Sequence, residues 1–175
     1  MKRIKLIAAI AFLLCGLIFA AWYKQPKTPL AALEKGYMGK QDSILRYCAL
    51  IEQVDINQNK SLLFYYNGRG NVNCAVAEKK IAGYRIVDVN AELAPYHEDL
   101  RVGLYGSTYD KGKKWVYFGI IYDDSVDKVV WNNIEGVRFS SSDMDMVYAV
   151  GDGDFKGNEY HIYDADGNEL EHHRS

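Results

Sequence analysis

The sequence predicts a mainly β protein that follows an N-terminal transmembrane helix. In the predicted fold, a short helix and about ten short antiparallel strands form a sandwich or two packed small sheets. Three observations lead to this class. Residues 6–23 carry no charge, the 175 residues include 14 Tyr and 3 Pro, and turn signals recur between runs rich in Val and Ile. A long uncharged apolar stretch is typical of a membrane span, and Tyr, Val and Ile are enriched in strands.

Residues 1–23 are expected to form a basic head and a transmembrane anchor. Lys2, Arg3 and Lys5 precede the uncharged stretch of 18 residues. As a helix this stretch would be roughly 27 Å long, close to the hydrocarbon thickness of about 30 Å. Its Leu, Ile and Phe side chains favour insertion by about 3 to 5 kcal/mol in total.

A cleaved signal peptide is the alternative for this segment. Signal peptides have a shorter apolar stretch of about 7–15 residues, with small residues at positions −3 and −1 of the cut. Cleavage after Ala20 would put Ile18 at −3, and cleavage after Ala21 would put Phe19 there. Cys15 follows a leucine, which argues against a lipoprotein signal. We therefore expect the anchor to be retained.

The basic head sets the expected orientation. Trp22 and Tyr23 fit the interfacial aromatic belt, and Lys24 and Lys27 lie just beyond them. Basic residues thus flank both ends of the anchor, so the charge bias is small. A short first segment led by a basic head usually keeps that head in the cytoplasm. We expect a single-pass protein of the cell membrane with an extracytoplasmic C-terminal domain.

Composition argues against a nucleic-acid partner. The net charge is −2, the sequence pI is about 6.1, and no basic stripe is present. The C-terminal part gathers acidic residues, which argues mildly against a surface lying flat on anionic lipid. These residues are Asp123, Asp124, Asp127, Asp143, Asp145, Asp152 and Asp154. Outside the anchor, Cys48 and Cys74 could form a disulfide in an oxidising compartment, and the favoured alternative is two small buried apolar residues.

After the anchor the chain divides into a linker at 24–29, a first β meander with a short helix at 30–94, and a second β meander at 100–175. Thr28 can cap a helix that has Pro29 in its first turn and ends at Gly36. Residues 43–52 fit either a helical face or a strand, and we favour a strand from Ile44 through 56. Turns rich in Gly, Asn and Asp delimit the later strands. They are expected at residues 62–66, 72–76, 84–89, 101–109, 115–122, 128–131, 136–139, 146–150, 159–163 and 169–172.

Several short motifs form a recognisable layout after the anchor. They are Gly83-Tyr84-Arg85, residues 117–121 with Asp123, residues 126–129, Arg138-Phe139 and residues 163–167. This layout resembles one that recurs among small membrane-anchored proteins of Gram-positive bacteria, a family of unknown function. The resemblance covers most of the chain after the anchor. It implies an extracytoplasmic β-rich domain and supplies no activity or functional residues.

One acidic loop starts like a calcium site. Asp152, Asp154 and Asn158 supply oxygen atoms at the first, third and seventh positions. Lys156 stands where the fifth ligand is needed, and Tyr163 stands where the bidentate Glu should be. Hairpin turns rich in Asp and Asn are the favoured alternative. The four histidines show no ligand spacing in the sequence, and we expect no cofactor.

The sequence holds no catalytic motif. Cys48 lacks an identifiable base, and the serines at 140–142 lie in no nucleophile elbow. The carboxylate pairs Glu98 with Asp99 and Asp143 with Asp145 could serve as acid and base in sugar hydrolysis. Solvated loop carboxylates are far more common, so we expect a protein that is not an enzyme.

Aromatic residues on neighbouring hairpins offer a better functional candidate. Strand alternation puts Trp115 and Tyr117 on one face of their strand, and Tyr105 and Tyr109 lie on the hairpin partner. Such a face could bind a glycan or a peptide, and the favoured alternative is a second core layer. We expect an anchored extracytoplasmic binding or interaction module without catalytic activity. Its partners would be the membrane and an envelope protein or cell-wall polymer, and the alternative is an envelope hydrolase that uses loop carboxylates.

Overall fold

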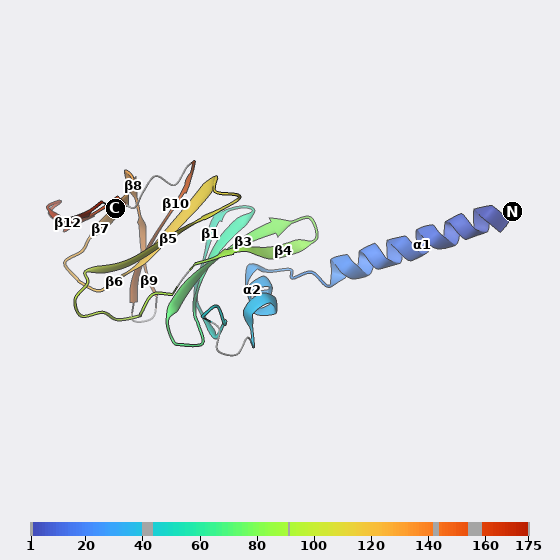
Figure 1. Cartoon of the computed structure of the whole chain (residues 1–175), viewed down its shortest axis with the longest axis horizontal. Helices are drawn as coiled ribbons and strands as arrows, with labels where there is room; N and C mark the ends of the chain where they lie inside the picture. The colour runs from blue at the N-terminus through green and yellow to red at the C-terminus, as the bar shows by residue number, and fades with distance from the viewer. Residues whose placement is uncertain (1, 40–43, 91, 142–143, 154–158, 175) are drawn as a thin grey trace.

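A computed structural model describes residues 2–39, 44–90, 92–141, 144–153 and 159–174, with the side chains of 2–9 and 21 left outside that description. A long helix, α1 (Lys2–Tyr23), extends away from a β-domain, as Figure 1 shows. A short helix, α2 (Pro29–Tyr37), packs on the domain. The strands are β1 (Ala49–Asn57), β2 (Lys60–Tyr66), β3 (Val72–Lys80), β4 (Gly83–Val89), β5 (Val102–Tyr109), β6 (Lys114–Ile121), β7 (Lys128–Trp131), β8 (Ile134–Glu135), β9 (Val137–Ser141), β10 (Met144–Asp152), β11 (Tyr160–Tyr163) and β12 (Glu169–His173).

The predicted mainly β class is confirmed, but the number of sheets is higher than predicted. The strands form three four-stranded antiparallel sheets, in the orders β1-β2-β3-β4, β5-β6-β10-β9 and β12-β11-β7-β8. The second meander divides because β7 pairs with β11 instead of with its neighbours in the chain. A sandwich or a pair of sheets is therefore too simple a description.

The strand that we expected from Ile44 begins later. β1 starts at Ala49, and Tyr47 makes an isolated bridge with Met38 instead. Cys48, the residue before β1, makes one backbone hydrogen bond to the neighbouring strand, from its N–H to the Tyr66 carbonyl at 3.0 Å. The strand interpretation thus holds only for the second half of the ambiguous segment.

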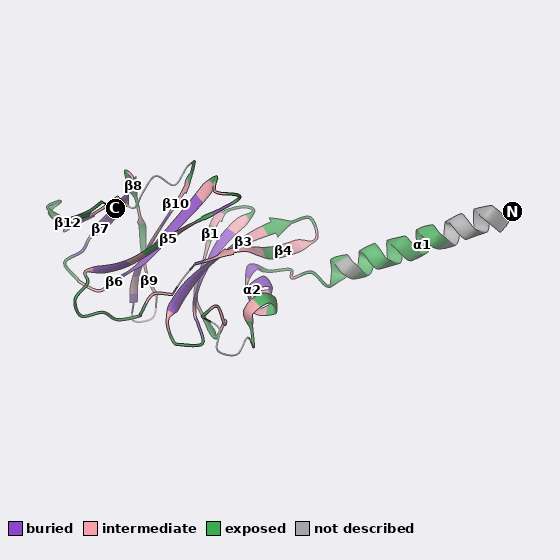
Figure 2. Ribbon diagram, in the orientation of Figure 1, coloured by how far each residue is buried: buried purple, intermediate pink, exposed green. Residues whose placement is uncertain are grey.

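Two cores lie on opposite faces of the middle sheet, β5-β6-β10-β9. Along β6, Val116, Phe118 and Ile120 pack against the first sheet. The alternate residues Trp115 and Tyr117 pack against the third sheet. Figure 2 shows this sheet as one of the most deeply buried parts of the molecule. Burial of each large apolar side chain contributes roughly 1.5–3 kcal/mol to folding, so β6 stabilises both sides of the domain at once.

Helix α2 covers the outer face of the first sheet. The Thr28 hydroxyl accepts a hydrogen bond from the Ala31 N–H at 3.1 Å, and Pro29 occupies the first turn, as predicted. Leu33 is fully buried against Leu63 and Tyr65 of β2. The domain is therefore layered, with α2 followed by the first, second and third sheets.

The linker after α1 is tied to the turn between β3 and β4. The Pro26 carbonyl accepts from the Tyr84 N–H at 2.8 Å, and Lys27 Nζ donates to the Ala82 carbonyl at 2.8 Å. A Cβ on Gly83 would lie 2.2 Å from the Pro26 oxygen, so only glycine permits this approach. The start of the domain is thus bound directly to the β3–β4 hairpin.

The described side chains of α1 have no protein cover. All of those from Ile10 to Ala20 are exposed, including Phe12, Leu17 and Ile18. Within the residues that the structure describes, no helix is both long enough and apolar enough to cross a membrane. The predicted transmembrane helix is therefore left as a prediction.

Candidate metal centre

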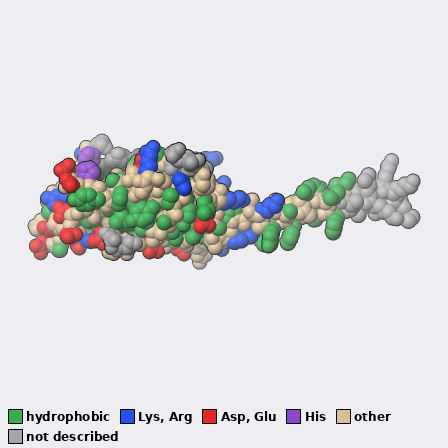
Figure 3. Space-filling model, turned by 90° about the horizontal axis from the view of Figure 1, so that it is seen from below, with side chains coloured by type: hydrophobic (Ala, Val, Ile, Leu, Met, Phe, Trp, Pro, Cys, Tyr) green, Lys and Arg blue, Asp and Glu red, His purple; other side chains and the backbone are tan. Residues whose placement is uncertain are grey.

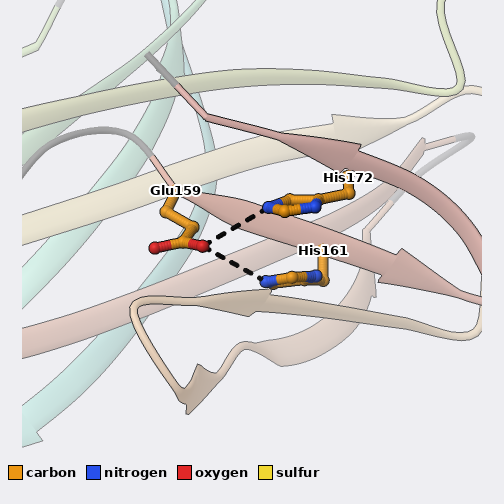
Figure 4. A group of neighbouring side chains, drawn as sticks. All are labelled: Glu159, His161 and His172. Carbon is orange, nitrogen blue, oxygen red and sulfur yellow. Dashed lines mark hydrogen bonds and ion pairs between the residues drawn. The ribbon is translucent and has the colours of Figure 1, made fainter.

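The β11–β12 hairpin brings two histidines together at the end of the domain far from α1 (Figures 1 and 4). Its turn is built by Asp164, whose Oδ1 accepts hydrogen bonds from the backbone N–H groups of Asp166 and Asn168 at 3.0 and 2.7 Å. This turn pairs Tyr163 with Glu169, and a β-bulge next to that pair shifts the register by one residue, so that His161 lies directly opposite His172. Directly opposed residues of antiparallel strands project from the same face of the sheet. The imidazole rings stack, with centroids 4.1 Å apart and planes inclined by 17°.

Glu159 completes the cluster from the residue just before β11. Its Oε1 lies 3.3 Å from Nε2 of His172 and 3.9 Å from Nε2 of His161. Figure 4 shows the carboxylate facing the same edge of both rings. One ligand atom from each of the three residues lies within 4.8 Å of the others. The side chains of His161 and His172 are 24% and 44% exposed, so an ion could reach them from solvent.

A second carboxylate faces the other edge of the imidazoles. Oε1 of Glu169 lies 3.1 Å from Nδ1 of His161 and 3.9 Å from Nδ1 of His172. A carboxylate that accepts from Nδ1–H holds the ring in the tautomer whose Nε2 lone pair is free to bind a metal. Glu169 therefore orients His161, and Glu159 belongs to the ligand set.

The donor set suits a borderline transition metal. Imidazole nitrogen with carboxylate oxygen binds Zn²⁺, Cu²⁺ or Ni²⁺, whereas Ca²⁺ takes about six to eight oxygen atoms. Ligand atoms around tetrahedral Zn²⁺ lie about 3.4 Å apart at bond lengths of about 2.1 Å. The Glu159–His172 separation of 3.3 Å already fits, and the Glu159–His161 separation of 3.9 Å would have to shorten. Three protein ligands leave one position for water or for an atom of another molecule.

This cluster was not predicted from the sequence, although a signal was present. His161 and His172 lie five residues out on either side of the Asp166–Gly167 pair. A two-residue turn at that pair would make the histidines cross-strand neighbours, and the structure reaches the same pairing through a wider turn and a β-bulge. The two histidines are too far apart along the chain to show a ligand spacing.

The predicted calcium ligands are not brought together in the described structure. The carboxylate of Asp152 is exposed and forms an ion pair with Lys114. Asp154 and Asn158 lie outside the described residues. Calcium binding by this loop stays a prediction.

The four predicted binding residues mostly lie inside the domain. Trp115, Tyr117 and Tyr109 are 4%, 3% and 6% exposed, and Tyr105 is 37% exposed. The third sheet covers the face that we expected to be open, and Tyr117 stacks on Trp131 with centroids 5.3 Å apart. The face is thus the second core layer, the alternative that we favoured. Binding by these residues stays a prediction, and of the four only Tyr105 presents a substantially exposed ring.

A groove still connects two of these residues with the third sheet. Tyr105 and Tyr117 line it together with Trp131, Tyr160 and His173, and its volume is about 450 Å³. Tyr160 stacks on His173 with centroids 5.0 Å apart. Burial, reinforced by the nearby Glu171 carboxylate, raises the pKa of Tyr160 to about 12, so the phenol is neutral at neutral pH. Tyr160 and His173 are the strand neighbours of His161 and His172, and neighbouring residues of a strand point to opposite faces. The groove therefore lies on the side of the β11–β12 hairpin opposite the histidine pair.

The two cysteines outside α1 are free thiols in this structure. Cys74 is fully buried in the first core, which raises the pKa of its thiol, and Cys48 is exposed. β2 lies between their two chain segments, and the two cysteines are also offset along the strands, which places them more than about 10 Å apart. A disulfide needs Cα atoms within about 7 Å, so this sheet does not form the predicted bridge. The alternative of a small buried residue holds for Cys74.

The carboxylates proposed for hydrolysis do not form an acid and base pair in the described residues. Hydrogen bonds from Ser140 and then Arg138 hold the pKa of Asp145 below its usual range, and Asp143 lies outside the described residues. A general acid at neutral pH needs a raised pKa. Glu98 and Asp99 are exposed on a loop. Nothing in this geometry favours the hydrolase alternative.

Comparison with known proteins gives no family for the chain. No family model matches it, and no curated protein or solved structure is significantly similar. The resemblance to small membrane-anchored proteins therefore stays a prediction that rests on the motifs alone.

Proposed function

We propose that the chain is a membrane-anchored, extracytoplasmic binding module that holds a divalent transition-metal ion at Glu159, His161 and His172. The observation that carries the proposal is the convergence of three ligand atoms within 4.8 Å on an accessible hairpin. Zn²⁺ suits the site best because it accepts mixed nitrogen and oxygen ligands in tetrahedral geometry. An envelope protein or cell-wall polymer could supply the remaining ligand.

Anchoring is supported by the sequence and by the exposure of α1. Residues 6–23 are uncharged, and the described apolar side chains of α1 lack protein contacts that would bury them. A contiguous exposed apolar surface marks a membrane or protein contact. The basic head favours the orientation with the domain outside the cell.

Binding fits the site better than catalysis does. A metal-dependent hydrolase needs a general base beside the open coordination position. Glu169, the nearest further carboxylate, faces the Nδ1 edge of the rings, on the opposite side from Glu159. Among the described residues, the geometry thus provides a ligand set with no further carboxylate on the Nε2 side of the rings.

Calorimetric titration of the purified full chain in detergent with ZnCl₂ tests the metal site. We expect one ion per chain, and at least about 10-fold weaker binding after His161→Ala or His172→Ala. His173→Ala is the matched control, because this neighbour stacks on Tyr160 and not on the histidine pair. Binding that is unchanged in both ligand variants would contradict the proposal.

Protease accessibility in intact cells tests the location. A tag at the C-terminus should be lost when protease is added outside the cells. Protection of the tag until lysis would place the domain in the cytoplasm and contradict the extracytoplasmic assignment.

A further inference from the structure

The tip of the β3–β4 hairpin carries a fully exposed apolar residue. Ile81 is 101% exposed, the largest value among the exposed large hydrophobic side chains of the described residues. Lys80 pairs with Gly83, so Ile81 and Ala82 alone form the turn. Neither residue has a positive φ, so the turn does not require Asn, Asp or Gly at these positions. The turn accepts an isoleucine, but no packing within the domain explains one here.

Hydrogen bonds place this tip beside the end of α1. Nε1 of Trp22 donates to the Ile81 carbonyl at 3.3 Å, and Nζ of Lys27 donates to the Ala82 carbonyl at 2.8 Å. The ammonium group of Lys27 also lies 3.7 Å from the centre of the Trp22 ring. Trp at the end of an anchoring helix marks the level of the lipid headgroups. The hydrogen bond from Trp22 therefore holds Ile81 at the same level.

Lysines surround the tip and the helix end. Figure 3 shows several basic side chains where α1 joins the domain, with histidines at the other end of the molecule. The exposed lysines of these segments are Lys24, Lys27, Lys35, Lys79 and Lys80. The nearby Glu78 is already neutralised, since it pairs with Lys80 at 2.6 Å and with Arg85 at 3.2 Å. This end of the domain therefore carries a positive surface that includes the exposed apolar side chain of Ile81, beside the exposed rings of Trp22 and Tyr23.

We propose that the β3–β4 tip is a second membrane contact, in which Ile81 enters the headgroup region and the surrounding lysines bind anionic lipid headgroups. The proposal rests on the anchoring proposed above. A lipid surface fits better than a protein partner, because a stable protein interface needs a broad complementary patch, whereas one apolar side chain among lysines is typical of an interfacial membrane contact. Two contacts would fix the orientation of the domain on the bilayer, with the third sheet pointing away from it.

Site-specific labelling of the full chain tests this contact. Cys15→Ala and Cys48→Ser remove the exposed thiols and leave Cys74, which is fully buried. Ile81→Cys then carries an environment-sensitive fluorophore, and Ala165→Cys, in the exposed β11–β12 turn, is the matched control. The chain is reconstituted into vesicles of phosphatidylglycerol and phosphatidylcholine, with nitroxide-labelled lipid as quencher. Flotation of the vesicles is measured on the same samples.

We expect the labelled chain to float with the vesicles. The label at position 81 should emit at shorter wavelength and be quenched at least two-fold more than the label at 165. Quenching at 81 should fall after Lys79→Gln with Lys80→Gln, and in vesicles of phosphatidylcholine alone.

The contrary outcomes separate the two proposals. Flotation with an unquenched label at 81 overturns the hairpin contact and leaves the anchor in place. Failure to float overturns the anchor and, with it, the hairpin contact. Equal quenching in neutral and anionic vesicles overturns the role of the lysines.

Discussion

Two hairpins near opposite ends of the β-domain, β3–β4 and β11–β12, build tight turns from different residues (Figure 1). In β11–β12, Asp164 accepts hydrogen bonds from the turn's own backbone, and Gly167 takes the left-handed conformation with φ of +83°. In β3–β4, Ile81 and Ala82 offer their carbonyls to Trp22 and Lys27, which lie outside the hairpin.

The comparison separates turn residues that the fold itself explains from turn residues that it does not explain. The Asp-rich turn satisfies its own polar groups and fixes the strand register, so its residues are explained locally. The isoleucine at the other tip neither fills a core nor satisfies a polar group. Contact with something outside the domain, such as the proposed lipid surface, therefore explains an isoleucine at this position better than folding does. Variants of the two hairpins distinguish these explanations.

The largest expected effect is the difference in stability loss between two isoleucine-to-alanine substitutions, one in each hairpin. Ile162 of β11 is 1% exposed, and Ile162→Ala should lower the free energy of unfolding by about 2–5 kcal/mol, because it leaves a cavity in the second core. Ile81→Ala should change it by less than about 0.5 kcal/mol. Urea unfolding of the full chain in detergent, followed by tryptophan fluorescence, measures both. Equal losses would make Ile81 part of the fold and remove the contrast.

Zinc should stabilise the chain through one hairpin only. At a free ion concentration of 100 times its Kd, the free energy of unfolding should rise by about 2.7 kcal/mol, provided that the unfolded chain does not bind zinc. At the same zinc concentration the rise should fall to about 1.4 kcal/mol or less in His161→Ala, as 10-fold or weaker binding requires, and should persist in His173→Ala. The same urea titration with and without ZnCl₂ measures it, and an undiminished rise in the ligand variant would argue for binding elsewhere.

Acid should weaken the β11–β12 turn selectively. Hydrogen bonds, first from the side chain of Asn168, hold the pKa of Asp164 below its usual value of 3.8. The carboxylate therefore contributes stability above that value, and the contribution is lost as the pH falls through the lower pKa of the folded state. The difference in unfolding free energy between the native chain and Asp164→Ala should shrink below about pH 4. A difference that does not change with pH would show that the carboxylate charge plays no part in the turn.

The smallest effect is expected at the linker. Lys27→Met removes the hydrogen bond to Ala82 and should change global stability by less than about 0.5 kcal/mol. It should speed hydrogen exchange at the Tyr84 amide, which donates to Pro26. Mass spectrometry of the exchanged peptide measures this. Lys111→Met, in the exposed turn between β5 and β6, is the control that should leave the rate unchanged.

Local chemistry made much of the fold predictable. The Thr28 cap with Pro29 predicted α2, and the alternation on β6 predicted one core face and one aromatic face. The partition into three sheets was not predictable, because β7 pairs with β11 across the intervening β8, β9 and β10. Local patterns carry no information about which of several similar strands will pair.

Part of the candidate site could be predicted from the sequence. The Asp-Gly turn indicated a hairpin that carries both His161 and His172, but the β-bulge that sets them opposite each other was not predictable, and Glu159 joins them from outside the paired residues. The sequence did not decide whether Trp115 and Tyr117 are buried, because a half-exposed aromatic face and a second core layer give the same alternation. The covering residue Trp131 comes from a strand whose partner is distant in the chain.

The middle sheet carries a hydrophobic core on each of its faces, and this gives the domain a mechanical property. Such a sheet cannot bend or slide without disturbing two cores, so the layers between the β3–β4 tip and the histidine pair behave as a stiff spacer. With the tip resting on lipid, the imidazoles stand at a constant height above the bilayer. Under the proposals made above, an ion bound there would be held away from the lipid headgroups.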